Sequence, residues 1–257
     1  MCNLNRLSDA FKERIYRQLL PLEALRRFGI DRETLKDVQG KRLVEFTFPE
    51  GSSIFKLDIR PEAGFRDPLI RVELVDNCLN QIELLLLMVN DPVSERFGID
   101  RDEQGERTLF GTVRRNLPEE TRAMEAGLAP GQVRRGLRFS RLIVSMVEDF
   151  VRHLGRDHFV VEPLAYHNAI LFERMGFAYV QGLPWMRWIH DAFQPGAPLH
   201  QTLDSSTPFR QPDAWRTVRG RSWAIHDGVL GEPWDDIKMV KFVGRDASMD
   251  TFPGGAY

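Results

Sequence analysis

The segment 133–138, Val-Arg-Arg-Gly-Leu-Arg, places three arginines around one glycine directly before a long apolar pattern. Glycine lets the backbone approach a ligand closely, and the free amides at a helix start point toward an anion. Arginine adds positive charge and paired donors for phosphate. The segment therefore predicts a phosphate or pyrophosphate site. A plain basic loop with a glycine before the helix is the alternative.

Helices and strands are expected around this turn. Apolar residues recur at helical spacing over 142–154, and Gly155 is a suitable C-terminal stop. A short apolar strand follows at 158–163, a second helix opens at Asn168, and another strand begins after residue 177. The order turn, helix, strand, helix, strand indicates a mixed α/β core.

The earlier part of the chain changes from helical to strand periodicity near residue 40. Three short helices are expected first, the second stopping at Gly29 and the third over 31–38. Alternating apolar residues then predict strands, the first two forming a hairpin. The four strands are expected at 43–48, 54–59, 69–75 and 82–89. The last is almost continuously apolar, as in a central strand covered on both faces.

Three further elements are expected from local signals. Residues 108–113 favour a strand. Asn116 followed by Pro118 and two acids is typical of a helix start, and this helix should end near Gly127. Residues 179–189 are predicted to be the last regular strand, interrupted at 182–184.

The composition is that of an ordinary globular chain, with 257 residues of which 42% are apolar and 28% charged. The 35 basic and 37 acidic residues give a net charge of -2, which argues against a general nucleic-acid binder. Cys2 and Cys78 have no C-x-x-C partner, which favours a reducing cytoplasm. The longest apolar run, 84–89, is far below the roughly 20 residues needed to cross a bilayer. We therefore expect a cytoplasmic protein with neither a nucleic-acid nor a membrane partner.

The length permits one large domain or two small ones. We place the main domain at 1–190 and a C-terminal extension at 191–257. The extension is rich in Pro, Gly, Ser and Asp, yet it carries Trp215, Trp223 and Trp234. Side chains of this size are rarely left in solvent. The extension is thus expected to pack on the main domain as a lid, a dimer contact or an extra small domain.

Two segments of the chain resemble the GNAT superfamily of acyl-CoA N-acyltransferases. Residues 133–155, VRRGLRFSRLIVSMVEDFVRHLG, are similar to the pyrophosphate loop and following helix of that family. Residues 167–177, HNAILFERMGF, resemble its later signature, and the strand at 158–163 falls between them as in the family. The resemblance implies an α/β (α+β) fold whose mixed, mostly antiparallel central sheet is flanked by helices.

The resemblance also implies a co-substrate, acetyl-CoA or another acyl-CoA, with no metal. Asn168 matches the family's helix-opening Asn, and a plain N-cap is the alternative for it. The residues implied to bind the co-substrate are Arg134, Arg135, Gly136, Leu137, Arg138, Asn168 and Phe172.

Two positions depart from the family pattern. Arg138 stands where the family has a small residue, so its side chain either crowds the diphosphate or binds a phosphate itself. Phe172 stands where family members often have the tyrosine that protonates the leaving thiolate. A general acid must then be Tyr166, Tyr179 or water, with a packing role as the alternative for Tyr166.

N-acyl transfer also requires a base that takes a proton from the acceptor ammonium, directly or through water. A carboxylate on a strand beside the co-substrate would serve, and Glu83 and Glu106 are the candidates. Glu83 is alternatively the polar break in a buried strand, and His167 is a further candidate base.

The first hypothesis is an N-acyltransferase that moves an acetyl or other acyl group from acyl-CoA to an amine by direct attack. Its acceptor would be a small-molecule amine or a protein amine, and a homodimer is an open possibility. The alternative is a GNAT-fold protein that no longer catalyses and serves as a binding or scaffold module, which Arg138 and Phe172 motivate.

Overall fold

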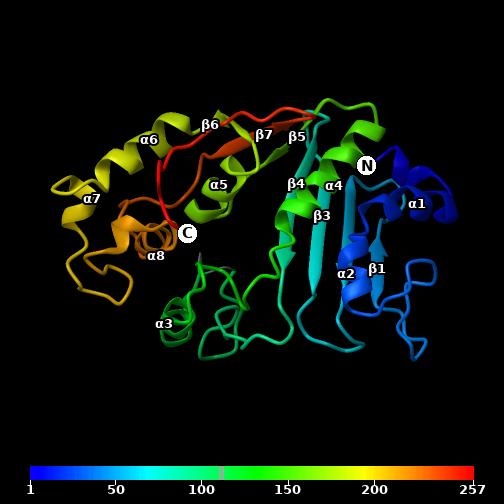
Figure 1. Cartoon of the computed structure of the whole chain (residues 1–257), viewed down its shortest axis with the longest axis horizontal. Helices are drawn as coiled ribbons and strands as arrows, with labels where there is room; N and C mark the ends of the chain where they lie inside the picture. The colour runs from blue at the N-terminus through cyan, green and yellow to red at the C-terminus, as the bar shows by residue number, and fades with distance from the viewer. Residues whose placement is uncertain (110, 112) are drawn as a thin grey trace. The chain divides into compact units, whose positions relative to one another are not determined.

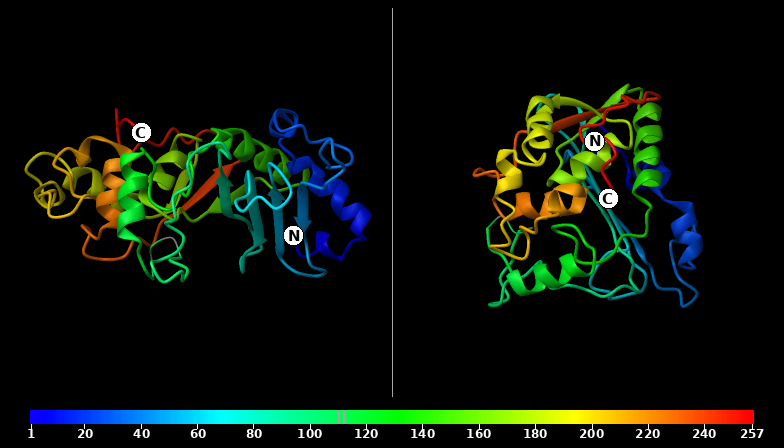
Figure 2. Two further views of the ribbon diagram at one scale, coloured as in Figure 1. Left: turned by 90° about the horizontal axis from the view of Figure 1, so that it is seen from below. Right: turned by 60° about the vertical axis from the view of Figure 1, so that its left-hand side comes forward.

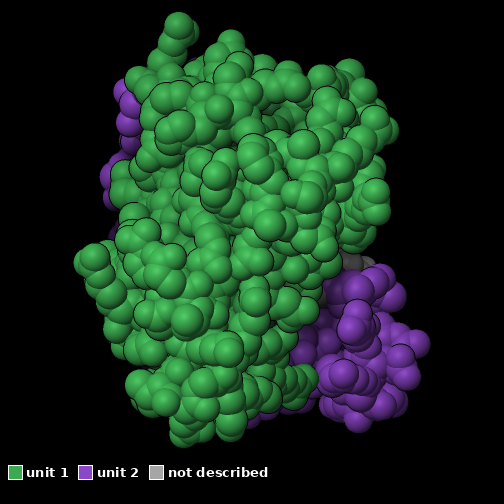
Figure 3. Space-filling model, turned by 90° about the vertical axis from the view of Figure 1, so that its right-hand side faces the viewer, with its two compact units in different colours: residues 1–93, 136–161, 240–245 green, residues 94–135, 162–239, 246–257 purple. Residues whose placement is uncertain are grey.

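The computed structural model describes residues 1–109, 111 and 113–257. These residues form two compact units, coloured separately in Figure 3. Unit 1 comprises 1–93, 136–161 and 240–245, and unit 2 comprises 94–135, 162–239 and 246–257. Each unit brings together segments that are distant in the sequence.

The four strands expected in the first part of the chain are confirmed. They are β1 (Val44–Thr47), β2 (Ile54–Ile59), β3 (Ile70–Asp76) and β4 (Ile82–Val89). Each pairs antiparallel with the next, and β1 and β2 form the expected hairpin. Phe55, Leu57 and Ile59 of β2 are buried at alternate positions, because successive side chains of a strand point to opposite faces.

The described strands form one seven-stranded sheet of order β1-β2-β3-β4-β5-β7-β6 (Figure 1). The last three strands are β5 (His158–Val161), β6 (Ala178–Gln181) and β7 (Lys238–Phe242). The strand β5 lies parallel to β4, whereas β1 to β4 alternate in direction. The expected mixed α/β fold with a mostly antiparallel sheet is therefore present.

The helices of unit 1 cover one face of its strands (Figure 2). They are η1 (Leu4–Arg6), α1 (Asp9–Tyr16), η2 (Arg17–Leu19), α2 (Leu22–Arg27) and α4 (Ser140–His153). The ring of Tyr16 lies 4.0 Å from Phe55 of β2 and 6.0 Å from Phe150 of α4, measured between centroids. The N-terminal helices and the long α4, both expected, thus share one apolar layer against the sheet.

The helices of unit 2 are mostly short. They are α3 (Leu117–Glu125), α5 (Tyr166–Glu173), α6 (Leu183–Ala192), α7 (Pro198–Gln201), η3 (Ala214–Arg216) and α8 (Val218–His226). The predicted start of α3 is confirmed, because the Asn116 side chain accepts from the Glu119 amide at 3.3 Å and Pro118 lies in the first turn. No helix in the described part of the chain combines the length and apolar character needed to span a bilayer.

Two predicted elements are wrong. Residues 31–38 form a turn and not a helix, because the Asp31 carboxylate accepts from the amides of Glu33 and Thr34 and such side-chain bonds compete with helix formation. Residues after Gln181 form α6 and not a strand. Here Pro184 occupies the first turn, where proline is favoured, and Trp185 stacks on Trp188 one helical turn away. The strand predicted at 108–113 includes residues 110 and 112, which lie outside the described residues.

Candidate functional site

The parallel pair β4 and β5 in unit 1 is joined at one position. Glu83 of β4 lies opposite Val160 of β5, and no other residues in the described part of these two strands are paired. From there β4 continues to Val89. A stretch of strand without a neighbour presents unpaired N–H and C=O groups. This edge of β4 is therefore available to a ligand that can pair as a strand does.

A bulge lies on the same stretch of β4. Leu74 of β3 pairs with Leu84 and Glu73 pairs with Leu86, so Leu85 is the extra residue. Leu85 is 47% exposed, whereas Leu84 is 3% exposed. This corrects the expectation that β4 is covered on both faces. A bulge leaves the extra residue outside the ladder, so Leu85 interrupts the regular pairing of β4 with β3.

The glycine of the basic turn lies at the end of this strand. A Cβ built on Gly136 would stand 3.3 Å from the carbonyl oxygen of Val89. Gly136 is not in the left-handed region, so its role is to save space and not to permit an unusual backbone angle. Because position 136 has no side chain, the backbone of the turn lies directly against the end of β4.

The rest of the turn leads into α4. Arg138 has a φ of 63°, is exposed, and makes no hydrogen bond or ion pair with any described residue. The N-cap residue Phe139 provides no side-chain bond, and the first turn of α4 has no acidic residue. The first amides of a helix lack internal partners and carry the positive end of its dipole. Gly136, Leu137 and Arg138 thus stand at an α4 start suited to an anion.

The other two arginines of the predicted site belong to unit 2. Arg134 donates to the carbonyl oxygen of Ser94, and Arg135 donates to that of Ala126 at 3.0 Å. The amide of Arg135 also donates to the Ser94 hydroxyl at 3.2 Å. Both guanidinium groups therefore hold neighbouring backbone of unit 2.

The two candidate bases differ in position. Glu83 lies on β4 two residues before the bulge, is 8% exposed, and accepts from the Asn77 amide group at 3.5 Å. Glu106 is exposed and lies in a turn of unit 2, not on a strand as expected. The Asp102 carboxylate makes that turn by accepting from the amides of Gln104 and Glu106. Of the two, Glu83 is the carboxylate that shares a strand with the bulge.

Both candidate tyrosines lie in unit 2, where Tyr166 is buried and Tyr179 is partly exposed. Tyr166 is 1% exposed, and burial raises the pKa of its hydroxyl to about 12 against the lowering effect of the Arg221 charge. The Tyr179 hydroxyl donates to Glu173 at 2.5 Å, and burial together with that carboxylate raises its pKa. An effective general acid needs a pKa nearer the working pH. Both hydroxyls therefore stay neutral, and neither has a pKa suited to a general acid.

Helix α5 begins earlier than expected. Its N-cap is Ala165 and its first residue is Tyr166, so Asn168 lies inside the helix and is not its cap. The ring of Phe172 packs against Phe177 at 4.9 Å. His167 is 3% exposed, and its Nδ1 lies 2.9 Å from the Ser222 hydroxyl oxygen. Burial lowers the pKa of His167 to about 3, so this histidine is a neutral core residue.

The sequence did not reveal the bulge at Leu85, because 82–89 reads as an unbroken strand and a bulge leaves no mark in a continuous apolar run.

No group of three His, Cys, Asp or Glu side chains in the described ranges is arranged to hold a metal ion. Comparison with protein-family models, with curated proteins and with solved structures found no match to this chain.

Proposed function

We propose that this protein is an acyl-CoA-dependent N-acyltransferase with a GNAT-like fold. One observation carries the proposal. The open edge of β4, from the bulged Leu85 to Val89, ends against Gly136 in the turn that starts α4. An acyl-CoA combines a thioester, an extended arm with amide groups, and a diphosphate. The amide groups of the arm can pair with backbone groups along the open strand edge, and the diphosphate can bind at the start of the helix.

The order of elements supports the same proposal. Four antiparallel strands precede the basic turn, which is followed by α4, β5, α5 and β6. From the basic turn to β6 this is the succession that the resemblance to the GNAT superfamily implies, and α3 lies between the four strands and the turn. The seven-stranded, mostly antiparallel sheet agrees with it.

The reaction would proceed by direct attack of the amine on the thioester carbonyl. The C–N bond forms, the C–S bond breaks, and the thiolate leaves with the electron pair of the C–S bond. Negative charge that develops on the carbonyl oxygen would be stabilised by the Leu85 amide, since a fixed donor aimed at developing charge lowers the barrier. Glu83 would take the ammonium proton directly or through water. The second proton, lost from the nitrogen as the amide forms, would reach the thiolate through water, because Tyr166 is buried and the Tyr179 hydroxyl already donates to Glu173.

Calorimetric titration with acetyl-CoA tests the proposal at Gly136. The wild type should bind saturably, and Gly136→Ala should bind within about threefold, since its Cβ meets only the 3.3 Å contact with Val89. Gly136→Trp should lose at least about 30-fold, roughly 2 kcal/mol, with an unchanged far-UV spectrum. Binding that survives in a folded Gly136→Trp protein would overturn the site.

The second candidate is a non-catalytic acyl-CoA-binding protein of the same fold. The burial of Tyr166 and the bond of the Tyr179 hydroxyl to Glu173 favour it, because both raise the pKa of a hydroxyl that would have to protonate the thiolate. The two candidates separate in a thiol-release assay with acetyl-CoA and a panel of small and peptide amines. Release that depends on the amine supports the enzyme, whereas tight binding without release supports the binding protein.

A further inference from the structure

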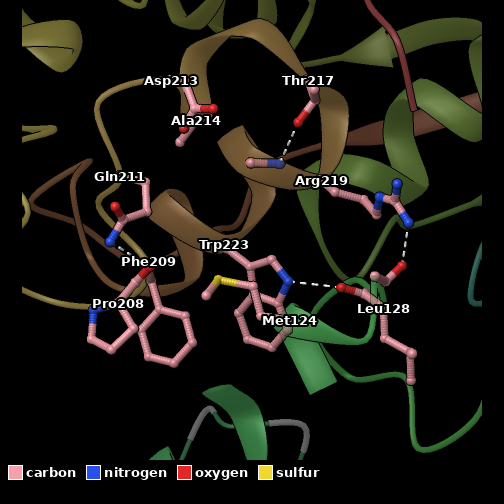
Figure 4. A pocket seen from close by; sticks show the side chains of 12 residues that line it. Met124, Leu128, Pro208, Phe209, Gln211, Asp213, Ala214, Thr217, Arg219 and Trp223 are labelled. Carbon is pink, nitrogen blue, oxygen red and sulfur yellow. Dashed lines mark hydrogen bonds between the residues drawn. The ribbon is translucent and has the colours of Figure 1, made fainter. Parts of the chain in front are cut away.

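Unit 2 contains a pocket that the proposed function does not use. It has a volume of about 240 Å³ and lies between the end of α3, the segment 208–214 and the first turns of α8 (Figure 4). Ligand pockets for drug-sized molecules are typically 300–1,000 Å³, so this pocket suits a smaller molecule. Its apolar lining residues are Met124, Leu128, Pro208, Phe209, Ala214 and Trp223.

The aromatic wall of the pocket is held rigidly. The rings of Phe209 and Trp223 stack with centroids 5.1 Å apart, and the Arg115 guanidinium lies 4.9 Å from the Phe209 ring. Arg115 is itself fixed by ion pairs with Glu120 at 2.6 Å and Asp227 at 2.9 Å. The indole N–H of Trp223 donates to the Leu128 carbonyl oxygen at 2.8 Å. Because the indole N–H is already bonded, the surface that Trp223 presents to a ligand is apolar and electron-rich.

The floor of the pocket is equally fixed. A Cβ on Gly220 would stand 2.3 Å from the Ala214 carbonyl oxygen, so η3 and α8 approach as closely as a glycine allows. Thr217 caps α8 by accepting from the Gly220 amide at 2.9 Å. Arg219 donates to the carbonyl oxygens of Gly127 and Tyr257. A preformed site of this kind loses little entropy when it binds a ligand.

Asp213 differs from the other polar side chains of the lining. Thr217, Gln211 and Arg219 all have hydrogen-bond partners. The Asp213 carboxylate is exposed at the rim and has neither a hydrogen bond nor an ion pair with any described residue. The lining thus contains both elements of cation recognition, a carboxylate as counter-charge and electron-rich aromatic rings.

We propose that this pocket binds a small protonated amine with an apolar or aromatic body. Its ammonium group pairs with Asp213, and its body lies against Trp223 and Met124. We favour a cation over a carboxylate ligand because Arg219 already donates to two carbonyl oxygens, whereas the Asp213 carboxylate has no partner among the described residues. The site lies wholly in unit 2 and does not depend on acyl-CoA binding.

The probe is phenethylamine, compared with phenethyl alcohol and phenylacetate. Binding is followed by the side-chain indole resonances of the ¹⁵N-labelled protein, whose five tryptophans give five signals, with the Trp223 signal assigned by Trp223→Phe. Phenethylamine should shift the Trp223 signal saturably. The alcohol should bind at least about fivefold more weakly, and phenylacetate should not shift the signal.

Asp213→Asn should weaken phenethylamine binding about tenfold, the loss of one charge-assisted contact. Glu125→Gln is the matched control, since it removes an exposed carboxylate on α3 next to Met124 that does not line the pocket. Gly136→Trp should bind phenethylamine as the wild type does, which separates this site from the proposed acyl-CoA site. An unmoved Trp223 signal, equal binding of phenylacetate, or undiminished binding by Asp213→Asn would each overturn the proposal.

Discussion

Gly136 lies against the carbonyl oxygen of Val89, so that an added Cβ would be only 3.3 Å from it. This contact connects two features of unit 1 that are 47 residues apart in the chain, the end of the open β4 edge and the start of α4. A ligand that follows the edge of β4 therefore arrives at the first amides of α4, which lack partners within the helix.

The bulge at Leu85 is tested by a pair of substitutions. Leu85→Pro removes the amide that the proposed mechanism uses, whereas Leu85→Ala keeps it and shortens a half-exposed side chain. Removing one donor to a developing oxyanion typically costs about 10²–10³ in kcat. We expect such a loss for Leu85→Pro with acetyl-CoA affinity within a few-fold, and a change under threefold for Leu85→Ala. Equal turnover of both variants would contradict the assignment, once calorimetry confirms that each binds acetyl-CoA.

A substitution of Arg138 tests whether its side chain crowds the diphosphate site or binds a phosphate. Its φ of 63° is a conformation that glycine adopts without strain, so Arg138→Gly should leave the free energy of unfolding unchanged or slightly higher. Because the side chain is exposed and has no partner among the described residues, we expect it to contact the diphosphate. Arg138→Gly should then weaken acetyl-CoA binding about tenfold in calorimetry and reduce its salt dependence. Tighter binding would show that the side chain crowds the site.

Gly220→Ala should reverse the usual effect of this substitution in a helix. Alanine in a helix interior normally stabilises by about 0.5–1 kcal/mol relative to glycine. Here the new Cβ would lie 2.3 Å from the Ala214 carbonyl oxygen and 2.7 Å from its Cα. We expect a loss of about 1–3 kcal/mol in urea unfolding. Ser145→Ala, at an exposed position of α4, is the control and should be neutral or slightly stabilising.

His167 should make stability depend on pH. Its pKa is lowered from 6.5 to about 3, first by burial and then by the charge of His226. Between these values the unfolded chain binds a proton that the folded protein does not, so stability falls as the pH falls below 6.5. From pH 6.5 to 5 the loss is about 2 kcal/mol.

The measurement is urea unfolding at pH 7.5 and 5.0. His167→Asn keeps an acceptor for the Ser222 hydroxyl and cannot titrate, so it should be less stable at pH 7.5 and lose less on acidification. His153→Asn, at an exposed position of α4, should lose as much as the wild type. If His167→Asn also loses as much as the wild type, the histidine does not govern this pH range.

Local signals were enough to predict many of the elements. The hairpin around 49–52 follows from alternation and turn residues, and α3 follows from the Asn116 cap and Pro118. These features act within a few residues of the chain. The two wrong elements also have local causes. The Asp31 side chain accepts from two backbone amides, and Trp185 and Trp188 have the spacing of a helix and not of a strand.

By itself, the sequence determined that a glycine and arginines precede a long amphipathic helix, and that an apolar strand lies at 82–89. The tertiary structure alone decided that this strand is bulged at Leu85 and meets β5 at one position, and that its end lies against Gly136. It also decided that Tyr166 is buried, that the Tyr179 hydroxyl bonds Glu173, and that Asp213 lies at the rim of an aromatic pocket. The reason is physical. Strand pairing, burial and the approach of separate segments depend on contacts between residues far apart in the chain, and such contacts leave no periodic pattern in the sequence.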